Sequence, residues 1–239
     1  MTARLLGPPG EAVEGVVFDL DDTLYPQRAW LEGACDAVAA RAADLGVDPV
    51  ALRGALVEAL ALGSDRGATI DRALEAIGAS APVEPLVTAF RAHAPARLDP
   101  YPGVDDALRD LGALVPLALV SDGDPPGQRA KLAATGLAAY FSAVVLSDEL
   151  GREHRKPDPL PYTTALAALG LPAQVVVAVG DRPGKDVLGA TRAGLRAVRV
   201  RTGEYASDAD APGTWAVADD VVEAAALVAS LVAPRVPSQ

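Results

Sequence analysis

Five short runs of mostly hydrophobic residues each end in a polar loop, and they set the framework of the chain. The runs cover residues 15–20, 115–120, 143–146, 175–179 and 196–200. Apolar runs of this length are typical of buried parallel strands, which are covered on both faces. Stretches with helical periodicity lie before or between the last four runs, at residues 104–111, 128–134, 160–169 and 187–193. This alternation predicts an α/β protein with a doubly wound parallel sheet.

The segment from Tyr25 to about Pro100 breaks the alternation. It contains no strand-like run, and its hydrophobic residues recur at helical spacing in four stretches separated by glycines and prolines. We therefore expect an all-helical cap domain, residues 25–100, inserted into a core domain made of residues 1–24 and 101–239. Residues 220–232 predict a final helix packed on the core, and the tail 233–239 is expected to fray.

Composition and charge exclude several classes of partner. Half of the residues are hydrophobic and 22% are charged, as in ordinary globular proteins. The net charge of -11 disfavours nucleic acid and anionic membranes, so neither is expected as a partner. No uncharged stretch is long enough to span a bilayer, and the first residues lack the pattern of a signal peptide. Together with a single cysteine, Cys35, these features favour a cytoplasmic protein.

Three aspartates, Asp19, Asp21 and Asp22, follow the first predicted strand in the sequence FDLDDTLYP. Carboxylates placed together at the end of a buried strand repel one another unless they share a cation or a proton. With no histidine or cysteine beside them, these oxygen ligands favour Mg²⁺. The alternative is a helix N-terminus, with Asp21, Asp22 and Thr23 as capping residues. The motif by itself supports the two interpretations about equally.

Polar residues in the loops after the other strands change this balance. Ser121 offers a hydroxyl and an N–H group to a phosphoryl oxygen, and Lys156 offers a cation. Asp181 and Asp186 can complete a metal site. Each also has a structural explanation as a turn, a solvated lysine before a proline, or a helix cap. Ligands of such sheets bind at the carboxyl ends of the strands, where all of these loops lie.

Taken in chain order, these residues resemble the four motifs of the haloacid dehalogenase (HAD) superfamily: Asp19-Leu20-Asp21-Asp22-Thr23, Ser121, Lys156, and Gly180-Asp181 with Asp186. The resemblance extends from about residue 15 to residue 204, and the helical insert resembles the C1 cap of the phosphatase-like branch. It implies that Asp19 is a nucleophile that forms an aspartyl-phosphate and that Asp21 is the general acid and base. Asp22 is the least certain member of the cluster.

The resemblance also implies the ligands of the metal and of the phosphoryl group. Mg²⁺ would be held by Asp19, Asp21 through its backbone carbonyl, and Asp181, with Asp186 supporting the metal shell. Lys156 would be catalytic as well as phosphate-binding. The phosphate-binding residues expected beside it are Thr23, Ser121, Asp122 and Gly123.

Two features of the sequence reduce the number of activities expected within the superfamily. Dehalogenases lack the second aspartate of the first motif, whereas Asp21 is present, and phosphonate hydrolases use a cap lysine that residues 25–100 do not contain. The sequence therefore favours a Mg²⁺-dependent phosphatase of a small phosphorylated metabolite, a sugar or polyol phosphate. A nucleoside 5'-monophosphate phosphatase and a phosphomutase are the alternatives within the family.

Two readings from other classes remain. A phospho-acceptor signalling domain shares the sheet, the acidic cluster and the lysine, but it lacks a helical insert and has about half this length. A non-catalytic binding subunit is disfavoured because every expected catalytic side chain is present. The apolar helices of the insert are compatible with a monomer or a homodimer.

The loop after the second strand, SDGDPPGQ, departs from similar phosphatases at Asp122, where a neutral residue is common. A carboxylate beside a phosphate pocket weakens anion binding unless it points away or contacts hydroxyl groups of the substrate. Asp122 and Asp124 are therefore expected to affect which leaving group the enzyme accepts. His93 and His154 have no partner at metal-ligand spacing, which favours structural roles.

Overall fold

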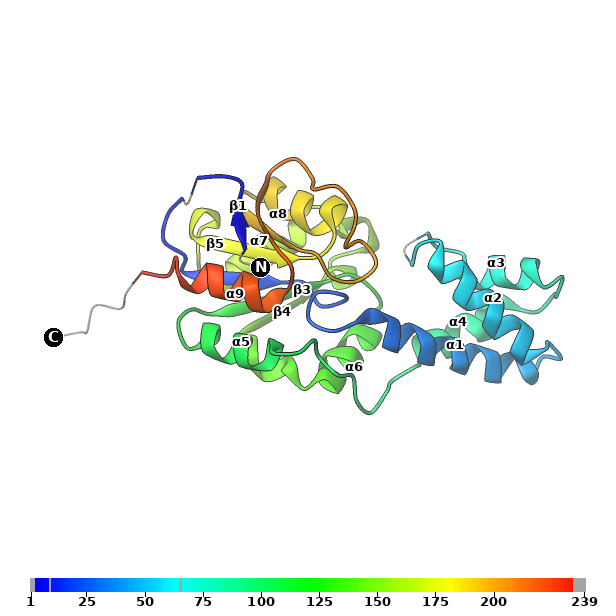
Figure 1. Cartoon of the computed structure of the whole chain (residues 1–239). Coiled ribbons are helices and arrows are strands. Elements are labelled where there is room, and N and C mark those ends of the chain that lie inside the picture. The colour runs from blue at the N-terminus through cyan, green and yellow to red at the C-terminus, as the bar shows by residue number, and fades with distance from the viewer. Residues whose placement is uncertain (1–2, 9, 65, 234–239) are drawn as a thin grey trace. The chain divides into compact units, whose positions relative to one another are not determined.

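A computed structural model describes residues 3–8, 10–64 and 66–233 of the chain (Figure 1). The chain divides into two compact units. One, here called the core unit, consists of Met1–Pro26 and Asp99–Gln239, and the other, the helical unit, is Gln27–Leu98. The tail that the sequence analysis expects to fray, residues 233–239, lies outside the described residues from residue 234 onward.

The core unit contains one sheet, and its described strands follow the order β1-β7-β6-β5-β2-β3-β4. Their bounds are β1 Arg4–Leu5, β2 Gly15–Phe18, β3 Leu117–Ser121, β4 Ala143–Leu146, β5 Val176–Gly180, β6 Arg196–Val200 and β7 Thr214–Ala218. All neighbours pair in parallel except β1, which is antiparallel to β7. The doubly wound parallel sheet predicted from the sequence is confirmed.

Two strands, β1 at one edge of the sheet and its neighbour β7, escaped the sequence analysis. β1 has only two residues, both exposed, so it carries no hydrophobic pattern. β7 is a short, alanine-rich strand that follows a long polar loop, and it lies between β6 and β1. Neither strand changes the centre of the sheet, where β5, β2 and β3 lie side by side.

Helices cover both faces of the sheet, with α5, α6 and α9 on one side and α7 and α8 on the other (Figure 1). Their bounds are α5 Val104–Gly112, α6 Pro125–Thr135, α7 Leu160–Leu169, α8 Leu188–Arg192 and α9 Val221–Ala229. A π-helical turn, Pro183–Val187, leads into α8, and short 3₁₀ helices lie at Leu137–Tyr140, Ser147–Glu149, Arg152–His154 and Ala173–Val175.

The last helix is shorter than predicted. Asp220 caps α9 by accepting a hydrogen bond from the backbone N–H of Glu223 at 2.9 Å, as the sequence suggests. The helix ends at Ala229 rather than at Val232, because the chain turns there and Val232 forms an isolated parallel bridge with Val13. Pairing with a distant segment thus takes precedence over the local helical pattern.

The helical unit is built from α1 Gln27–Ala43, α2 Pro49–Ala61, α3 Thr69–Ala76 and α4 Val83–Arg91. Leucines and alanines from these helices form a hydrophobic core around Cys35, Val38 and Leu86. Trp30 is buried against Phe90, with an edge-to-face ring contact at 5.2 Å. Trp30 is therefore part of the core of this unit.

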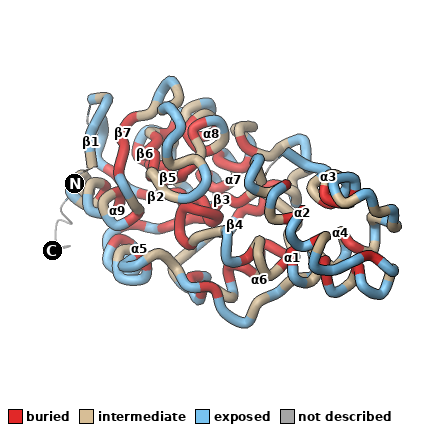
Figure 2. Tube along the Cα trace, turned by 45° about the vertical axis from the view of Figure 1, so that its right-hand side comes forward, coloured by how far each residue is buried: buried red, intermediate tan, exposed pale blue. Residues whose placement is uncertain are grey.

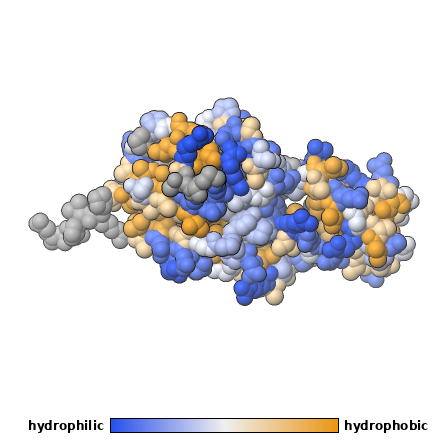
Figure 3. Space-filling model, in the orientation of Figure 1, coloured by the Kyte–Doolittle hydropathy of each residue, from blue (hydrophilic) through white to orange (hydrophobic). Residues whose placement is uncertain are grey.

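Buried residues concentrate in the strands of the sheet, whereas the helices alternate between buried and exposed positions (Figure 2). The core cluster includes Val17, Val120 and Ala178 on the central strands and Tyr162 on α7. Exposed large hydrophobic side chains are spread over both units and mix with hydrophilic residues on the face shown in Figure 3. Among the described residues, no helix has the length and apolar character needed to cross a membrane.

Candidate active site

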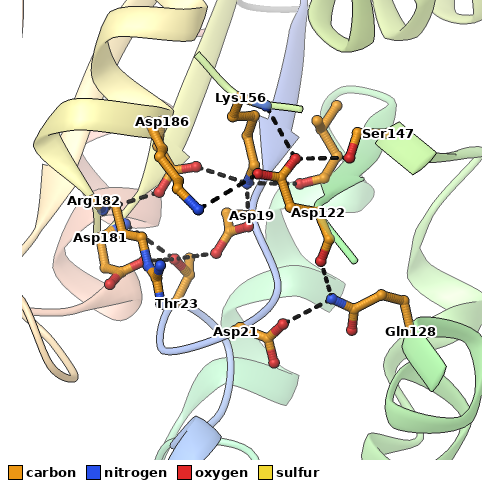
Figure 4. Close-up of polar contacts among 12 residues, drawn as sticks. Asp19, Asp21, Thr23, Asp122, Gln128, Ser147, Lys156, Asp181, Arg182 and Asp186 are labelled. Carbon is orange, nitrogen blue, oxygen red and sulfur yellow. Dashed lines mark hydrogen bonds and ion pairs between the residues drawn. The ribbon is translucent and has the colours of Figure 1, made fainter. Parts of the chain in front are cut away.

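The three central strands bring the sequence-predicted polar residues to one edge of the sheet. β2 pairs in parallel with β5 on one side and with β3 on the other. The loop after β2 carries Asp19, β3 ends at Ser121, and the loop after β5 begins with Asp181. Their side chains gather at the carboxyl ends of the strands (Figure 4). A parallel sheet places a ligand site at this position.

Asp19, Asp181 and Asp186 form a buried group of three carboxylates. One oxygen atom from each lies within 4.8 Å of the other two. Lys156 lies against this group, because its Nζ atom contacts Asp19 Oδ1 and lies 2.7 Å from Asp186 Oδ1. One ammonium group therefore faces two of three buried carboxylates, which leaves an excess of negative charge.

Burial and this excess of negative charge both affect the pKa values of the group. Burial, with the negative charge of Asp186 added to it, raises the pKa of Asp19 from 3.8 to about 7, despite the opposing effect of Lys156. Burial and the charges of Asp186 and Asp19 raise the pKa of Asp181 well above its ordinary value. Burial acts to lower the pKa of Lys156, but Asp186 and Asp19 more than offset it and raise that pKa.

The carboxylate group fits a divalent cation. It offers oxygen ligands without histidine or cysteine, which is the donor set that Mg²⁺ prefers. Asp181 Oδ2 is buried and has no hydrogen-bond partner, so it is open to a metal ligand role. A cation at this position would offset both the burial and the repulsion between carboxylates that raise the two pKa values.

Thr23 connects two of these carboxylates. Its hydroxyl oxygen lies 3.1 Å from Asp19 Oδ2 and 3.3 Å from Asp181 Oδ1, and it accepts the backbone N–H of Asp181 at 3.1 Å. The side chain is fully buried. Thr23 therefore links the loops after β2 and β5, and its predicted contact with phosphate stays a prediction.

Ser121 and Gly123 lie in the loop after β3. Ser121 Oγ is buried and has no hydrogen-bond partner, so its hydroxyl can donate to an oxygen atom of a ligand. Gly123 has a φ of 128°, and a Cβ atom there would lie 2.9 Å from the Gln128 amide nitrogen. The backbone conformation favours glycine at this position, and the Gln128 side chain would have to shift to admit a larger residue.

Asp122 directs its carboxylate to the loop of Lys156. Asp122 Oδ1 accepts hydrogen bonds from Ser147 Oγ at 2.7 Å and from the backbone N–H of Lys156 at 3.1 Å. Asp122 Oδ2 lies 3.8 Å from the Nζ atom of Lys185. The structure thus shows the carboxylate tying two loops together, whereas an influence of Asp122 or Asp124 on the leaving group stays a prediction.

Asp21 lies outside the carboxylate group and has its own partners. Its two oxygen atoms lie 2.9 and 3.0 Å from Lys131 Nζ, and they accept hydrogen bonds from Gln128 at 2.9 Å and Tyr25 at 2.5 Å. Burial acts to raise the pKa of Asp21, but the charge of Lys131 and these hydrogen bonds hold it below its ordinary value. A metal contact of Asp21 through its backbone carbonyl stays a prediction.

The sequence analysis missed Lys131, Gln128 and Tyr25. Gln128 and Lys131 lie on α6, three positions apart, and residues at this spacing share a helix face. One signal for Lys131 was available, because the chain has only three lysines, Lys131, Lys156 and Lys185, among many arginines. In the structure, all three lysines lie beside aspartates of this site.

Asp22 packs away from the carboxylate group, against the loop after β6. It adopts a left-handed backbone conformation, with a φ of 57°. Its backbone carbonyl accepts a hydrogen bond from the Thr202 hydroxyl at 2.5 Å, and its side chain accepts the N–H of Glu204 at 3.3 Å. Asp22 therefore connects two loops of the core unit.

Replacing Gly203 by alanine is expected to destabilise this connection. Gly203 has a φ of 65°, and an added Cβ would lie 2.2 Å from the Cβ of Asp22. The left-handed conformation and the overlap together should cost roughly 3 kcal/mol of unfolding free energy, measured by urea denaturation. Gly136→Ala is the matched control, because its φ is 74° but nothing lies within 4 Å of the added atom. We expect it to cost about 1 kcal/mol, and equal costs for the two variants would contradict the steric argument.

Comparison with known proteins agrees with this geometry. Residues 13–194 match the haloacid dehalogenase-like hydrolase family. A glyceraldehyde 3-phosphate phosphatase of Methanopyrus kandleri is 34% identical over 202 residues, which are 81% of this chain and 86% of that protein. A phosphoglycolate phosphatase of Rhodospirillum rubrum is 35% identical over 222 residues, which are 87% of each chain.

A solved structure is also similar in fold. It is a HAD hydrolase, YfnB from Bacillus subtilis, described as bound to magnesium, with a TM-score of 0.70 and 19% identity over 91% of this chain and 99% of the other. The protein belongs to the haloacid dehalogenase-like hydrolase family, as its sequence motifs indicated. Within that family it is an enzyme of the phosphatase class.

Proposed function

We propose that this protein is a Mg²⁺-dependent phosphatase that hydrolyses the phosphomonoester of a small metabolite through a phosphorylated Asp19. The observation that carries the proposal is the buried group of Asp19, Asp181 and Asp186, with Lys156 as its cation and the unpartnered Ser121 hydroxyl on the neighbouring strand. In this proposal these groups serve as the nucleophile, the cation site and the phosphate ligand.

The reaction divides into two steps. In the first, Asp21, whose pKa without substrate lies below its ordinary value, takes up a proton from water as the substrate binds. An oxygen of Asp19 then attacks phosphorus, the bond between phosphorus and the ester oxygen breaks, and Asp21 donates its proton to the departing oxygen. In the second, water attacks the phosphorus of phospho-Asp19, Asp21 takes a proton from that water, and inorganic phosphate and the Asp19 carboxylate are released. Asp21 is then protonated again, as it was before it donated to the departing oxygen.

Lys156 and Ser121 hold the phosphoryl oxygens in this proposal. The ammonium group of Lys156 offsets the repulsion between the Asp19 carboxylate and the phosphate dianion, and it stabilises the charge that develops in the transition state. Asp122 supports this role indirectly, because it fixes the backbone of Lys156. When bound by Asp19, Asp181 and Asp186, Mg²⁺ supplies Lewis-acid stabilisation of the phosphoryl group.

The substrate class we propose is a sugar or polyol phosphate. Two relatives that align over most of the chain are named for glyceraldehyde 3-phosphate and phosphoglycolate, which are small phosphorylated metabolites. The net charge of -11 requires that recognition of such an anion is local, through the lysines and the metal ion rather than through a general positive surface.

Phosphate release from a panel of substrates tests the proposal. The panel contains sugar and polyol phosphates, phosphoglycolate, nucleoside monophosphates and sugar bisphosphates, each with Mg²⁺ or with EDTA. We expect release that requires Mg²⁺ and is fastest for a small sugar or polyol phosphate. Fastest release from nucleotides would show that the substrate is a nucleoside monophosphate. Isomerisation of a sugar phosphate without phosphate release would show that the enzyme is a mutase and not a hydrolase.

The affinity for Mg²⁺ is expected to rise with pH. The pKa of Asp19 without metal is about 7, and the pKa of Asp181 is also raised, so Mg²⁺ must displace protons below neutral pH. For each proton that Mg²⁺ displaces, the affinity should rise by at most about tenfold per pH unit. For Asp19 this rise ends near pH 7. Calorimetric titration with Mg²⁺ at pH 5.5, 6.5 and 7.5 measures this rise, and an affinity independent of pH would contradict it.

A further inference from the structure

Two separate lysines serve the buried aspartates of the site. Lys156 contacts Asp19 and Asp186, whereas Lys131 contacts both oxygen atoms of Asp21. Both ammonium groups are deeply buried, with Lys131 only 4% exposed. A buried lysine is costly unless a carboxylate pairs with it. Asp21 therefore has a cationic partner of its own, distinct from the one at the carboxylate group.

Three donors fix the direction of the Asp21 carboxylate. Lys131 and Gln128 reach it from α6, and Tyr25 reaches it from the loop after β2. The Gln128 amide nitrogen donates to Asp21 Oδ2 and also contacts the backbone carbonyl of Asp122. Because both neighbours are acceptors, the amide cannot be reversed. Figure 4 shows the carboxylate directed toward Gln128 rather than toward Asp19.

We propose that Lys131 is the positioning residue of Asp21, so that α6 determines where the general acid presents its proton to the leaving group. This inference rests on the proposed function, in which Asp21 protonates the departing oxygen. Without the ammonium group, the Asp21 carboxylate keeps only neutral partners in a buried place and turns toward water. A displacement of about 1 Å at such a group is enough to slow proton transfer by about 10²-fold.

The kinetic test compares two leaving groups in Lys131→Met, whose side chain is similar in length but uncharged. One substrate is the best alkyl phosphate of the panel, whose leaving oxygen needs a proton, and the other is p-nitrophenyl phosphate, whose leaving group departs as an anion. The ratio kcat/KM covers the steps up to departure of the leaving group, so hydrolysis of phospho-Asp19 does not enter it. We expect a loss of about 10²-fold for the alkyl phosphate and less than about threefold for the aryl phosphate.

Two further variants control this comparison. Asp21→Asn removes the acid itself and is expected to show the same selectivity with a larger loss. Thr135→Val removes another buried polar group of α6, whose hydroxyl donates to the Leu132 carbonyl at 2.8 Å, and is expected to show no selectivity. Equal losses of Lys131→Met on the two substrates, or no loss on either, would overturn the proposal.

A crystal structure of Lys131→Met tests the placement independently of turnover. We expect the Asp21 carboxylate to have left hydrogen-bond distance of Gln128. If it keeps its hydrogen bonds to Gln128 and Tyr25, Lys131 does not position it and the proposal is overturned. A parent protein that releases no phosphate would overturn the proposed function instead, and the crystal structure would still decide the role of Lys131.

Discussion

Replacing Asp19 by asparagine is expected to reduce kcat on the preferred substrate by a factor on the order of 10⁴ or more, because the amide cannot attack phosphorus. The measurement is Mg²⁺-dependent phosphate release at substrate saturation, beside the parent protein. Residual turnover within about tenfold of the parent would contradict the assignment of Asp19 as the nucleophile.

Stability separates this chemical effect from misfolding. The pKa of Asp19 is raised from 3.8 to about 7 in the folded chain. A carboxyl group raised in this way contributes stability that is complete below about pH 4 and is lost as the pH rises through about 7. At pH 8 without metal, the ionised Asp19 carboxylate therefore destabilises the folded state. The Asp19→Asn variant, whose side chain is neutral, should melt at the same temperature as the parent or higher. A strongly lowered melting temperature would show that the loss of activity has another cause.

Replacing Lys156 by methionine is expected to affect both stability and activity. The side chain of Lys156 is only 3% exposed, and its removal leaves the Asp19 and Asp186 carboxylates without their cation. Breaking a buried pair in this way costs about 3–5 kcal/mol. Loss of a cation at the developing charge should reduce kcat by about 10³-fold. Urea denaturation at pH 8 without metal and phosphate release measure the two effects.

Lys185→Met is the matched control for stability. The side chain of Lys185 is 27% exposed and lies 3.8 Å from Asp122, so its removal should cost at most about 1 kcal/mol. The cost of Lys156→Met should also shrink at pH 5.5, because Asp19 and Asp181, whose pKa values are raised, take up protons there. Equal costs for the two lysines, or a cost independent of pH, would show that Lys156 does not neutralise the carboxylate group.

The centre of the fold and the carboxylate group followed from the sequence because both depend on short local patterns. The runs at β2, β3 and β5 are hydrophobic enough to identify buried strands, and parallel pairing then places their polar ends together. β1 and β7 could not be found in this way, since their pairing depends on neighbours rather than on their own residues.

The partners of the site residues were harder to predict, because they depend on side chains that meet only after folding. Lys156 stood out through its place in a loop after a strand, whereas Lys131 is in the middle of α6 and is 110 positions from Asp21 in the sequence. Asp122 shows the same limit, because the serine that fixes its carboxylate belongs to another loop. Residue type and position after a strand were sufficient to identify the carboxylates and Lys156, but not to find Lys131 or to show which charges pair.

The small number of lysines has a practical consequence for work on this enzyme. Reagents that acylate lysines need an accessible side-chain amine, and among the lysines Lys185 is by far the most exposed. A fluorescent ester would therefore label Lys185 before the other lysines and place a dye beside Asp122. Coupling to a sensor chip through lysine would in the same way attach the molecule next to its own site, so immobilisation through a terminal tag is the better choice.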